Sequence, residues 1–406
     1  MIGICPNCKE RARGDQCDTC GTVLEPELLH EQTCSICGTA PIYRETKHLY
    51  IAISKLESEL KAFVNSQTGW RKNAVSFTNK YIEEGLRDRA LTRDLNWGIG
   101  VPKSGYDGKK IYIWAENVLG YLSMSSIAAK ERNVPFATLW GEKAIHYYIH
   151  AKDNIPFHTI ILPSLIWAHR EGYHLPDYII SNEYLTLEGR KISTSQNWAI
   201  WVKDIIESYD PDSLRYFLIA NGPEKRDTDF SWHEYVNCHN GELLGCYGNF
   251  INRTVMFLQK YFNNAIPCGS IEHDIDSRIS NAYVSVGKKI EEGKLKDALE
   301  EIFEFVRFGN KYFDTEAPWL TRTTDIDKCK SSIFNCAQLI VNYAILLAPF
   351  LPFSSDRVIK WFGVSTDWKK QYTPTGYVIP ETNILFERLD KNIVEDETNK
   401  LHDKAK

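Results

Sequence analysis

Four cysteines near the N-terminus form two closely spaced pairs whose residue type suits metal binding. Cys5 and Cys8 form the first Cys-x-x-Cys pair, Cys17 and Cys20 form the second, and eight residues separate the pairs. Each pair presents two thiolates from one tight turn, and two such turns supply the four sulfur ligands of a zinc site. Four protein ligands leave no open position for catalysis, so the zinc is expected to be structural. The alternative is a set of unligated thiols or a redox pair.

A third pair, Cys34 and Cys37, has no further Cys-x-x-Cys partner downstream. Either these two thiols pack without metal, or a partner pair lies upstream of residue 1 and the four together would bind a second zinc. The other five cysteines are scattered singly. This distribution indicates metal ligation in a reducing compartment rather than a disulfide scaffold.

Three residues in the second half of the chain could recognise nucleic-acid bases. The segment GNFINRTVMF places Asn249 and Arg253 four residues apart, hence on the same face of a helix. Both side chains could reach base edges there, and Trp319 in EAPWL offers a plane on which an unstacked base could lie. The alternative for this group is an ordinary solvated polar face.

The composition is that of a folded soluble protein with two or three domains. The chain has 406 residues, of which 43% are apolar and 25% are charged. No apolar run approaches the roughly 20 residues that span a membrane, and the N-terminus does not resemble a signal peptide, so a cytoplasmic location is expected. The net charge of −5 argues against a generally basic nucleic-acid coat. Any RNA contact would therefore come from local patches, shape and stacking.

The apolar pattern changes along the chain. Residues 1 to about 45 show little periodicity, whereas residues 47–89 have a helical pattern. Between about 95 and 180, short apolar runs alternate with helix-length segments, which favours a doubly wound α/β sheet. From about residue 205 nearly everything is expected to be helical. One apolar stripe there consists of Leu244, Tyr247, Ile251, Val255, Leu258 and Phe262. The last sixteen residues are charged and are expected to fray.

Taken in the order of the sequence, the motifs from about residue 3 to 390 resemble those of methionyl-tRNA synthetase, a class I aminoacyl-tRNA synthetase. CPNCKERARGDQCDTCG is similar to the zinc-bearing connective peptide of the archaeal-type branch, and TRDLNWGIGVP resembles the return from that peptide into the sheet. In that branch a further Cys-x-x-Cys completes a second knuckle with the equivalents of Cys34 and Cys37.

The resemblance implies an α/β plus α fold. It would contain a partial Rossmann-type nucleotide-binding sheet, a zinc-knuckle connective peptide and a C-terminal helical anticodon-binding bundle. The implied boundaries are 1–95 for the connective peptide, 96–180 for the second half of the Rossmann domain, 181–235 for the signature-loop and stem-contact region, 236–390 for the anticodon-binding domain and 391–406 for a charged tail.

The resemblance also implies a methionine-binding pocket. IYIWAENVLGYLS is similar to the strand and loop beside that pocket, so Trp114 and Tyr121 would line it, where aromatic rings suit the thioether sulfur. HAKDNIPFHTIILPSL resembles the next motif, which usually begins with Gly where this chain has Ala151. There Asp153 would hold the amino end and ribose region, and His158 would lie against the methionine side chain. Without the resemblance, these four would be interpreted as core aromatics, an N-cap and a satisfied core histidine.

LEGRKISTSQNWAIWV occupies the place of the KMSKS signature of class I synthetases. Arg190, Lys191, Ser193 and Ser195 match it, while Thr194 stands where the standard form has a second lysine. A mobile loop of this kind stabilises the charge that develops on ATP phosphates. The resemblance assigns that contact to Lys191 or Arg190, and it assigns the reading of the CAU anticodon to the three base-recognition candidates above.

The HIGH motif of class I synthetases is absent, because none of the eleven histidines lies in a His-x-Gly-His sequence. That motif meets the ATP phosphates at a helix N-terminus. The chain is therefore interpreted as lacking the first half of its nucleotide-binding fold, which would leave an edge or face of the sheet exposed. Adenylation by this chain alone is expected to be inefficient.

Two functions remain as hypotheses. The first is a methionine–tRNA ligase polypeptide that joins methionine to tRNA(Met), with structural Zn²⁺ and with ATP and Mg²⁺ as substrate. Its HIGH half would be supplied by a separate chain or by a longer product. The second is a catalytically silent truncated paralogue that binds tRNA or methionine, with a zinc-stabilised structural partner of a full-length synthetase as a weaker form. A monomer without membrane contact is expected, since no dimerisation module follows residue 390.

Overall fold

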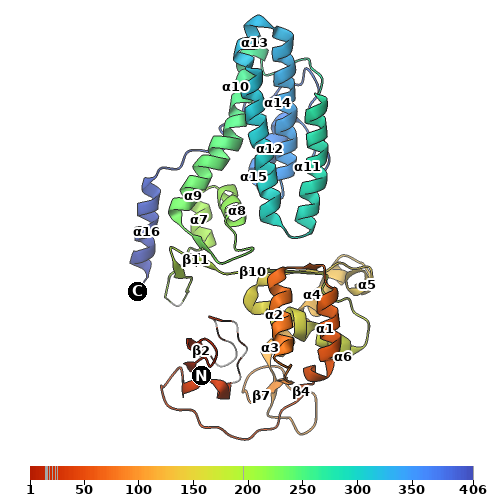
Figure 1. Ribbon diagram of the computed structural model, residues 1–406, viewed down its shortest axis with the longest axis vertical. Helices are drawn as coiled ribbons and strands as arrows, with labels where there is room; N and C mark the ends of the chain where they lie inside the picture. The colour runs from red at the N-terminus through yellow and green to blue at the C-terminus, as the bar shows by residue number, and fades with distance from the viewer. Residues whose placement is uncertain are drawn as a thin grey trace. The chain divides into compact units, whose positions relative to one another are not determined.

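The computed structural model divides the chain into two compact units, unit 1 (Met1–Glu183) and unit 2 (Tyr184–Lys406), shown in Figure 1. The structure describes residues 1–13, 17, 19–20, 22, 24, 26–194 and 196–405. Within these residues, no helix is both long enough and apolar enough to cross a membrane.

Unit 1 begins with a small antiparallel sheet that brings the first cysteines together. Its strands are β1 (Ile2–Ile4), β2 (Arg11–Arg13) and β3 (His30–Thr33), in the order β2-β1-β3, and η1 (Pro26–Leu28) precedes β3. Among the described residues of this segment, the core consists of Cys5, Ala12, Cys17, Leu24 and Leu29. Because so little apolar surface is buried, the cysteine sulfurs lie at the centre of the fold of this segment.

The predicted helical stretch 47–89 is only partly helical. It contains η2 (Ile53–Leu56), α1 (Glu57–Ser66) and α2 (Lys72–Glu83). Short strands border and interrupt these helices: β4 (Tyr50–Ile51), β5 (Gly69–Trp70) and β6 (Arg89–Ala90), with β7 (Thr92–Arg93) and β8 (Lys110–Ile111) following. Strand β5 forms because Gly69 has no Cβ. A Cβ there would lie 2.5 Å from the carbonyl oxygen of Asp177, so only glycine permits this close approach to the segment that leads into Tyr178–Asn182.

The main sheet of unit 1 is parallel, in the order β5-β10-β9. Strands β9 (Tyr147–Ala151) and β10 (Tyr178–Asn182) confirm two of the expected apolar strands. The helical segments between β8 and β10 are α3 (Ile113–Glu116), η3 (Asn117–Leu119), α4 (Gly120–Glu131), α5 (Phe136–Trp140), η4 (Lys152–Asn154), η5 (Phe157–Ile161) and α6 (Leu162–His169).

Two apolar segments depart from the strand-like interpretation. Of the four apolar runs expected between about 95 and 180 (KKIYIWAENV, KAIHYYIHAKD, FHTIILPSLIWAHR and PDYIISNEYLT), the third forms the π turn η5 and then α6, and the first contributes only β8 before α3 begins. A buried helix and a buried strand are both short apolar runs, so periodicity does not separate them. Among the described strands β9 ends the sheet, and Ile149 on it is 70% exposed.

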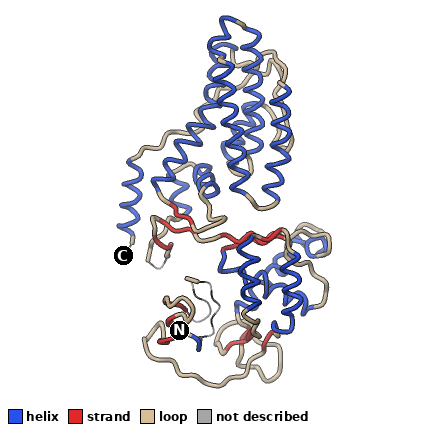
Figure 2. Tube along the Cα trace, viewed as in Figure 1, coloured by secondary structure: helices blue, strands red, loops and turns tan. Residues whose placement is uncertain are grey.

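Unit 2 contains a three-stranded sheet in the order β12-β11-β13, in which α7 and α8 come between β12 and β13, and its other regular elements among the described residues are helices (Figure 2). The strands are β11 (Leu185–Leu187), β12 (Arg190–Lys191) and β13 (Thr228–Phe230). The helices are α7 (Val202–Ser208), α8 (Pro211–Ala220), α9 (Trp232–Cys238), η6 (His239–Gly248), α10 (Asn249–Phe262), α11 (His273–Glu291), α12 (Leu295–Glu316), α13 (Pro318–Thr324), α14 (Ile326–Leu347), α15 (Pro352–Phe362) and α16 (Asn392–Lys404).

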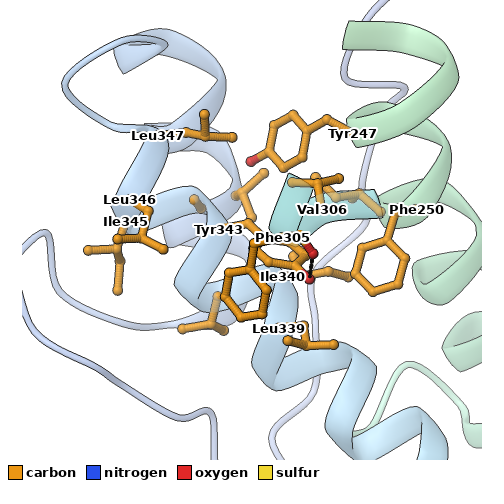
Figure 3. Packing of buried hydrophobic residues seen from close by; sticks show 14 of the residues in the cluster. Tyr247, Phe250, Phe305, Val306, Leu339, Ile340, Tyr343, Ile345, Leu346 and Leu347 are labelled. Carbon is orange, nitrogen blue, oxygen red and sulfur yellow. Dashed lines mark hydrogen bonds between the residues drawn. The ribbon is translucent and has the colours of Figure 1, made fainter. Parts of the chain in front are cut away.

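Helix α14 forms the centre of the bundle, and all of its residues from Ser332 to Leu347 are buried. The close-up in Figure 3 shows Tyr343 on α14 packed among side chains of α10 and α12. The Tyr343 hydroxyl donates a hydrogen bond of 2.6 Å to the carbonyl of Phe305. A buried hydroxyl without a partner would be destabilising, so this bond fixes how α12 and α14 meet.

Segments α9, η6 and α10 are continuous in the chain and form one long helical element. The predicted apolar stripe faces the bundle: Tyr247, Ile251, Val255 and Leu258 are buried, and Leu244 and Phe262 pack against the core. The middle part has π-helical hydrogen bonding, which the apolar spacing did not predict.

The expectation that the last residues fray is wrong. Helix α16 packs against α9 through Ile393, Val394 and Leu401, and Leu401 is only 4% exposed. Ile393 and Val394 are adjacent, and Leu401 follows them by eight and seven positions, so the three share one helix face in an otherwise charged segment.

Candidate functional site

The first two cysteine pairs converge on one point. The sulfur atoms of Cys5 and Cys20 are 3.8 Å apart, those of Cys8 and Cys17 are 3.5 Å apart, and all four lie within 4.8 Å of one another. Zn–S bonds of about 2.3 Å in tetrahedral geometry separate the sulfurs by roughly 3.8 Å. The donor set and its spacing therefore suit a zinc ion.

The third pair adopts the same kind of backbone turn as the first. The amide of Cys34 donates to Thr39 and the amide of Gly38 donates to Cys34, as the amides of Cys5 and Lys9 do in the first pair. Hydrogen bonding to Thr39 lowers the pKa of the Cys37 thiol to about 7. Among the described residues, no third metal ligand joins this pair. A second zinc there remains a prediction.

Tyr121 and His158 meet in unit 1. The Tyr121 Oη and His158 Nε2 atoms are 2.9 Å apart, and His158 Nδ1 lies 2.9 Å from the carbonyl oxygen of Asn154. The carbonyl can only accept, so Nδ1 carries the proton and Nε2 accepts from the tyrosine hydroxyl. Burial, and secondarily the neighbouring His150, lowers the pKa of His158 to about 4. The imidazole is therefore neutral at physiological pH.

Further polar groups lie where β9 and β10 end. Asp153 is half-buried in η4, directly after β9, and Asn154 Nδ2 donates to it. Beyond the end of β10, Glu183 accepts from Asn73 and pairs with Lys152 at 2.8 Å. Ligands of open α/β sheets bind at the carboxyl ends of parallel strands. Trp114 belongs to α3, but its side chain lies outside the described part of the structure.

Several residues at this site were not predicted from the sequence, among them His150, Asn73 and Glu183. His150 stacks on His158 with 4.3 Å between ring centroids, and its buried Nε2 has no hydrogen-bond partner among the described residues. Asn73 and Glu183 complete the polar edge. The signal for Glu183 was its place after an apolar run that forms a strand, whereas Asn73 is brought there only by the parallel pairing of β5 with β10.

An apolar cavity of about 570 Å³ also opens in unit 1. It is lined by Leu49, Leu91, Thr92, Ile99, Val101, Pro102, Ile111, Glu116, Leu119, Gly120, Ser123 and Leu165. Glu116 Oε2 is buried there without a hydrogen-bond partner among the described residues. The cavity thus suits an apolar group that carries a hydrogen-bond donor.

The segment that resembles the signature loop contains a tight β-hairpin in unit 2. Strands β11 and β12 are joined by Glu188 and Gly189, both with positive φ, as a two-residue type I′ turn requires. Arg190 and Lys191 on β12 are exposed. The Glu188 carboxylate accepts from the amide of Trp232 at 2.8 Å, which ties the turn to the start of α9.

The segment after β12 folds back on the hairpin. The amides of Ser193 and Trp198 each donate to the other residue's carbonyl at 2.9 Å. The Arg190 guanidinium lies 3.9 Å from the centre of the Trp198 ring. Ser195 lies outside the described residues, and Thr194 accepts from the amide of Asn197.

The base-recognition candidates lie on α10 and α13. Arg253 pairs with Asp314 at 2.5 Å, and its guanidinium lies 4.3 Å from the centre of the Phe313 ring and 6.0 Å from that of Trp319. Trp319 is 44% exposed, so one part of its surface is free to contact a base. Asn249 is half-buried one turn earlier on α10. Phe313 and Asp314, which hold Arg253 in place, were not singled out from the sequence.

Two family models match the chain and together span almost all of it. The one described as tRNA synthetases class I (M) matches residues 1–255, and the one described as anticodon binding domain of methionyl tRNA ligase matches residues 264–404. These matches, together with the parallel sheet and the helical bundle, define a class I tRNA synthetase. The chain belongs to the methionyl-tRNA synthetase family and is a ligase by family.

Known relatives are similar over nearly the whole chain. Methionine–tRNA ligase 1 of Alkaliphilus oremlandii is 52% identical over 402 residues, which cover 98% of this chain and 74% of that protein. A methionine–tRNA ligase of Bacillus cereus is 49% identical over 409 residues, covering 100% of this chain and 75% of that protein. The structure of Mycobacterium tuberculosis methionyl-tRNA synthetase bound by methionyl-adenylate has a TM-score of 0.77 at 20% identity, covering 87% of this chain and 72% of that chain. At this identity the structural likeness shows the fold alone.

Proposed function

We propose that this chain acts in methionine–tRNA ligation, in which methionine, ATP and tRNA(Met) give Met-tRNA, AMP and pyrophosphate. The observation that carries the proposal is the hydrogen bond between Tyr121 and the buried His158 beside the carboxyl end of the parallel sheet. A neutral imidazole whose acceptor is already occupied by a hydroxyl presents an uncharged surface, which suits a thioether side chain. Trp114 would complete this pocket, and Asp153 would hold the substrate's ammonium group and ribose region.

The exposed cations of the hairpin would contact ATP phosphates. Arg190 and Lys191 are adjacent on β12, and the turn before them is fixed by Asp229, whose carboxylate accepts from the Gly189 amide at 2.9 Å. Cations held in place before the reaction stabilise charge that develops on phosphates, and Mg²⁺ would accompany the ATP. Ser193 and Ser195 would complete the signature as donors.

Zinc and tRNA would be bound by residues distant in sequence from those that would contact methionine and ATP. Cys5, Cys8, Cys17 and Cys20 would bind a structural Zn²⁺. Within unit 2, Asn249, Arg253 and Trp319 would read the anticodon, with the indole stacking on an unpaired base. We propose that the chain does this as a monomer in the cytoplasm.

These 406 residues contain no His-x-Gly-His segment. We therefore propose that adenylation needs such a segment from another polypeptide or from the same gene product, and that the 406 residues alone adenylate methionine poorly. The competing proposal is a recognition module that binds tRNA or methionine without activating it, and it fits the same site residues.

Methionine-dependent ATP–pyrophosphate exchange tests both proposals. We expect little exchange by the 406-residue chain and recovery when a polypeptide bearing the HIGH motif from a related enzyme is added. Lys191→Ala should abolish the recovered exchange, whereas Lys288→Ala, which removes an exposed lysine on α11, should not. Exchange by the chain alone would refute the need for a HIGH segment. No recovery together with intact tRNA binding would favour the recognition module.

A further inference from the structure

Helix α16 contacts the signature hairpin, a name used for residues 187–194 and 196–198, although the two are far apart in sequence. The side-chain amide of Asn197 donates to the carbonyl of Lys404 at 2.8 Å, across 207 positions. The imidazole of His402 packs against the Trp198 indole with 5.1 Å between ring centroids and 64° between planes. Two side chains of the hairpin segment therefore rest on the last turns of the chain.

Trp198 connects these contacts to the phosphate-binding candidates. It is 1% exposed, and its indole N–H donates to the carbonyl of Leu187 at 2.9 Å. The same indole contacts His402 and carries the Arg190 guanidinium over its face. A displacement of Trp198 would therefore move Arg190 and the adjacent Lys191.

Helix α16 is itself anchored to the rest of unit 2, and Figure 1 shows it running alongside α9. Leu401 is buried in the cluster that also contains Trp232, and the Tyr209 hydroxyl donates to Glu397 at 2.8 Å. Lys404 pairs with Asp204 at 3.4 Å. The helix thus holds the hairpin against a fixed support rather than following its movements.

We propose that α16 positions the signature hairpin, with Asn197, Trp198 and His402 as positioning residues for Arg190 and Lys191. Asn197 has a φ of 54°, a conformation that asparagine tolerates better than most residues. The choice of residue there thus serves both the turn and the contact with α16. The value of this positioning for catalysis rests on the proposed function, whereas the positioning itself does not.

Hydrogen–deuterium exchange of the full chain tests the positioning. Asn197→Asp removes the donor but keeps the shape and the tolerance for positive φ, and His402→Ala removes the ring. We expect the Ser193 and Trp198 amides to exchange about three- to tenfold faster in each variant, the change that loss of one ordinary hydrogen bond or of one aromatic contact produces. Tryptic cleavage after Arg190 and Lys191 should accelerate likewise. The controls Gln196→Glu, which adds the same charge one position away, and Asn399→Ala, on the exposed face of α16, should change neither.

Exchange in α14 distinguishes positioning from general stability. Unchanged exchange there, with a local increase in the hairpin, supports the proposal. No increase in the hairpin, or an equal increase throughout unit 2, overturns it.

Tripolyphosphate separates this proposal from the proposed function. It should protect the hairpin from trypsin, and the tripolyphosphate concentration needed for protection should be higher in His402→Ala than in Asn399→Ala. Equal concentrations in these two variants would overturn the positioning role. No protection in any variant would instead refute phosphate binding by the hairpin, and amide exchange alone would then decide whether α16 holds it.

Discussion

The buried imidazole of His158 makes the stability of unit 1 depend on pH in a defined window. Burial lowers the pKa of this group from 6.5 to about 4. Below pH 6.5 the unfolded chain therefore binds a proton that the folded chain does not. The free energy of unfolding should be unaffected by this group above about pH 6.5 and should decrease as the pH falls toward 4.

The magnitude follows from the two pKa values. A pKa difference of this size corresponds to about 3 kcal/mol in the free energy of unfolding, of which about 2 kcal/mol should be lost by pH 5. His158 is only 5% exposed, so solvent screening reduces this little. His146 and His150, whose pKa values burial also lowers, add to the same decrease. Their contribution cancels when wild type is compared with His158→Gln.

Urea denaturation at pH 7.5 and pH 5 measures this difference. Unfolding of unit 1 is monitored by amide exchange in α6, corrected for the intrinsic exchange rate at each pH. His158→Gln should lose about 2 kcal/mol less than wild type between the two pH values. The control His169→Gln removes an exposed histidine at the end of α6 and should behave as wild type. Equal losses in wild type and His158→Gln, or an NMR titration of His158 near pH 6.5, would refute the reasoning.

Three further predictions concern the metal, the bundle and its core. Chelation of zinc should disorder residues 1–45 and leave the bundle folded, as amide exchange would report, because the small N-terminal core cannot replace roughly 10 kcal/mol of metal-linked folding energy. Trp319→Ala should weaken binding of an anticodon stem-loop, measured by fluorescence anisotropy, by about 1–3 kcal/mol through loss of one stacking surface. Gly309→Ala should destabilise unit 2 in urea by about 1–3 kcal/mol, because the added Cβ would lie 2.6 Å from the Tyr343 hydroxyl.

Each of these has a matched comparison. Melting of the bundle together with the N-terminal segment would contradict the first prediction. Phe353→Ala removes another exposed aromatic of the bundle and should leave stem-loop binding unchanged. Gly241→Ala adds a methyl group where nothing lies within 4 Å, so a loss as large as that of Gly309→Ala would contradict the packing argument.

Local patterns predicted several parts of the fold well. The spacing of Cys5, Cys8, Cys17 and Cys20 predicted that four sulfurs meet, because each pair is set by one turn. The helical stripe of α10 was readable because a long helix repeats its pattern over several turns. The resemblance to a known family placed Tyr121 and His158 at one pocket, which nothing in their local sequence would have done, and their mutual hydrogen bond was not predicted.

The parts that sequence reasoning missed depend on contacts between distant residues. Strand β5 exists because Gly69 allows the chain to approach Asp177. The charge of residues 391–406 predicts a frayed tail, whereas α16 forms because three apolar residues among the charges pack against the rest of unit 2. The support of Arg253 by Phe313 and Asp314 likewise comes from the packing of α10 beside the end of α12.

The long helical element from Trp232 to Phe262 has a mechanical consequence for unit 2. Its first residue is bonded to the turn of the signature hairpin, and its last turns carry Arg253. At about 1.5 Å per residue the element is a strut on the order of 45 Å long. It fixes both the distance between the two ends and their relative rotation about the helix axis. One residue inserted before Asn249 would rotate Arg253 by about 100° relative to the hairpin. An insertion or deletion in the middle of the element would therefore change the relative orientation of its two ends without altering any residue at either end.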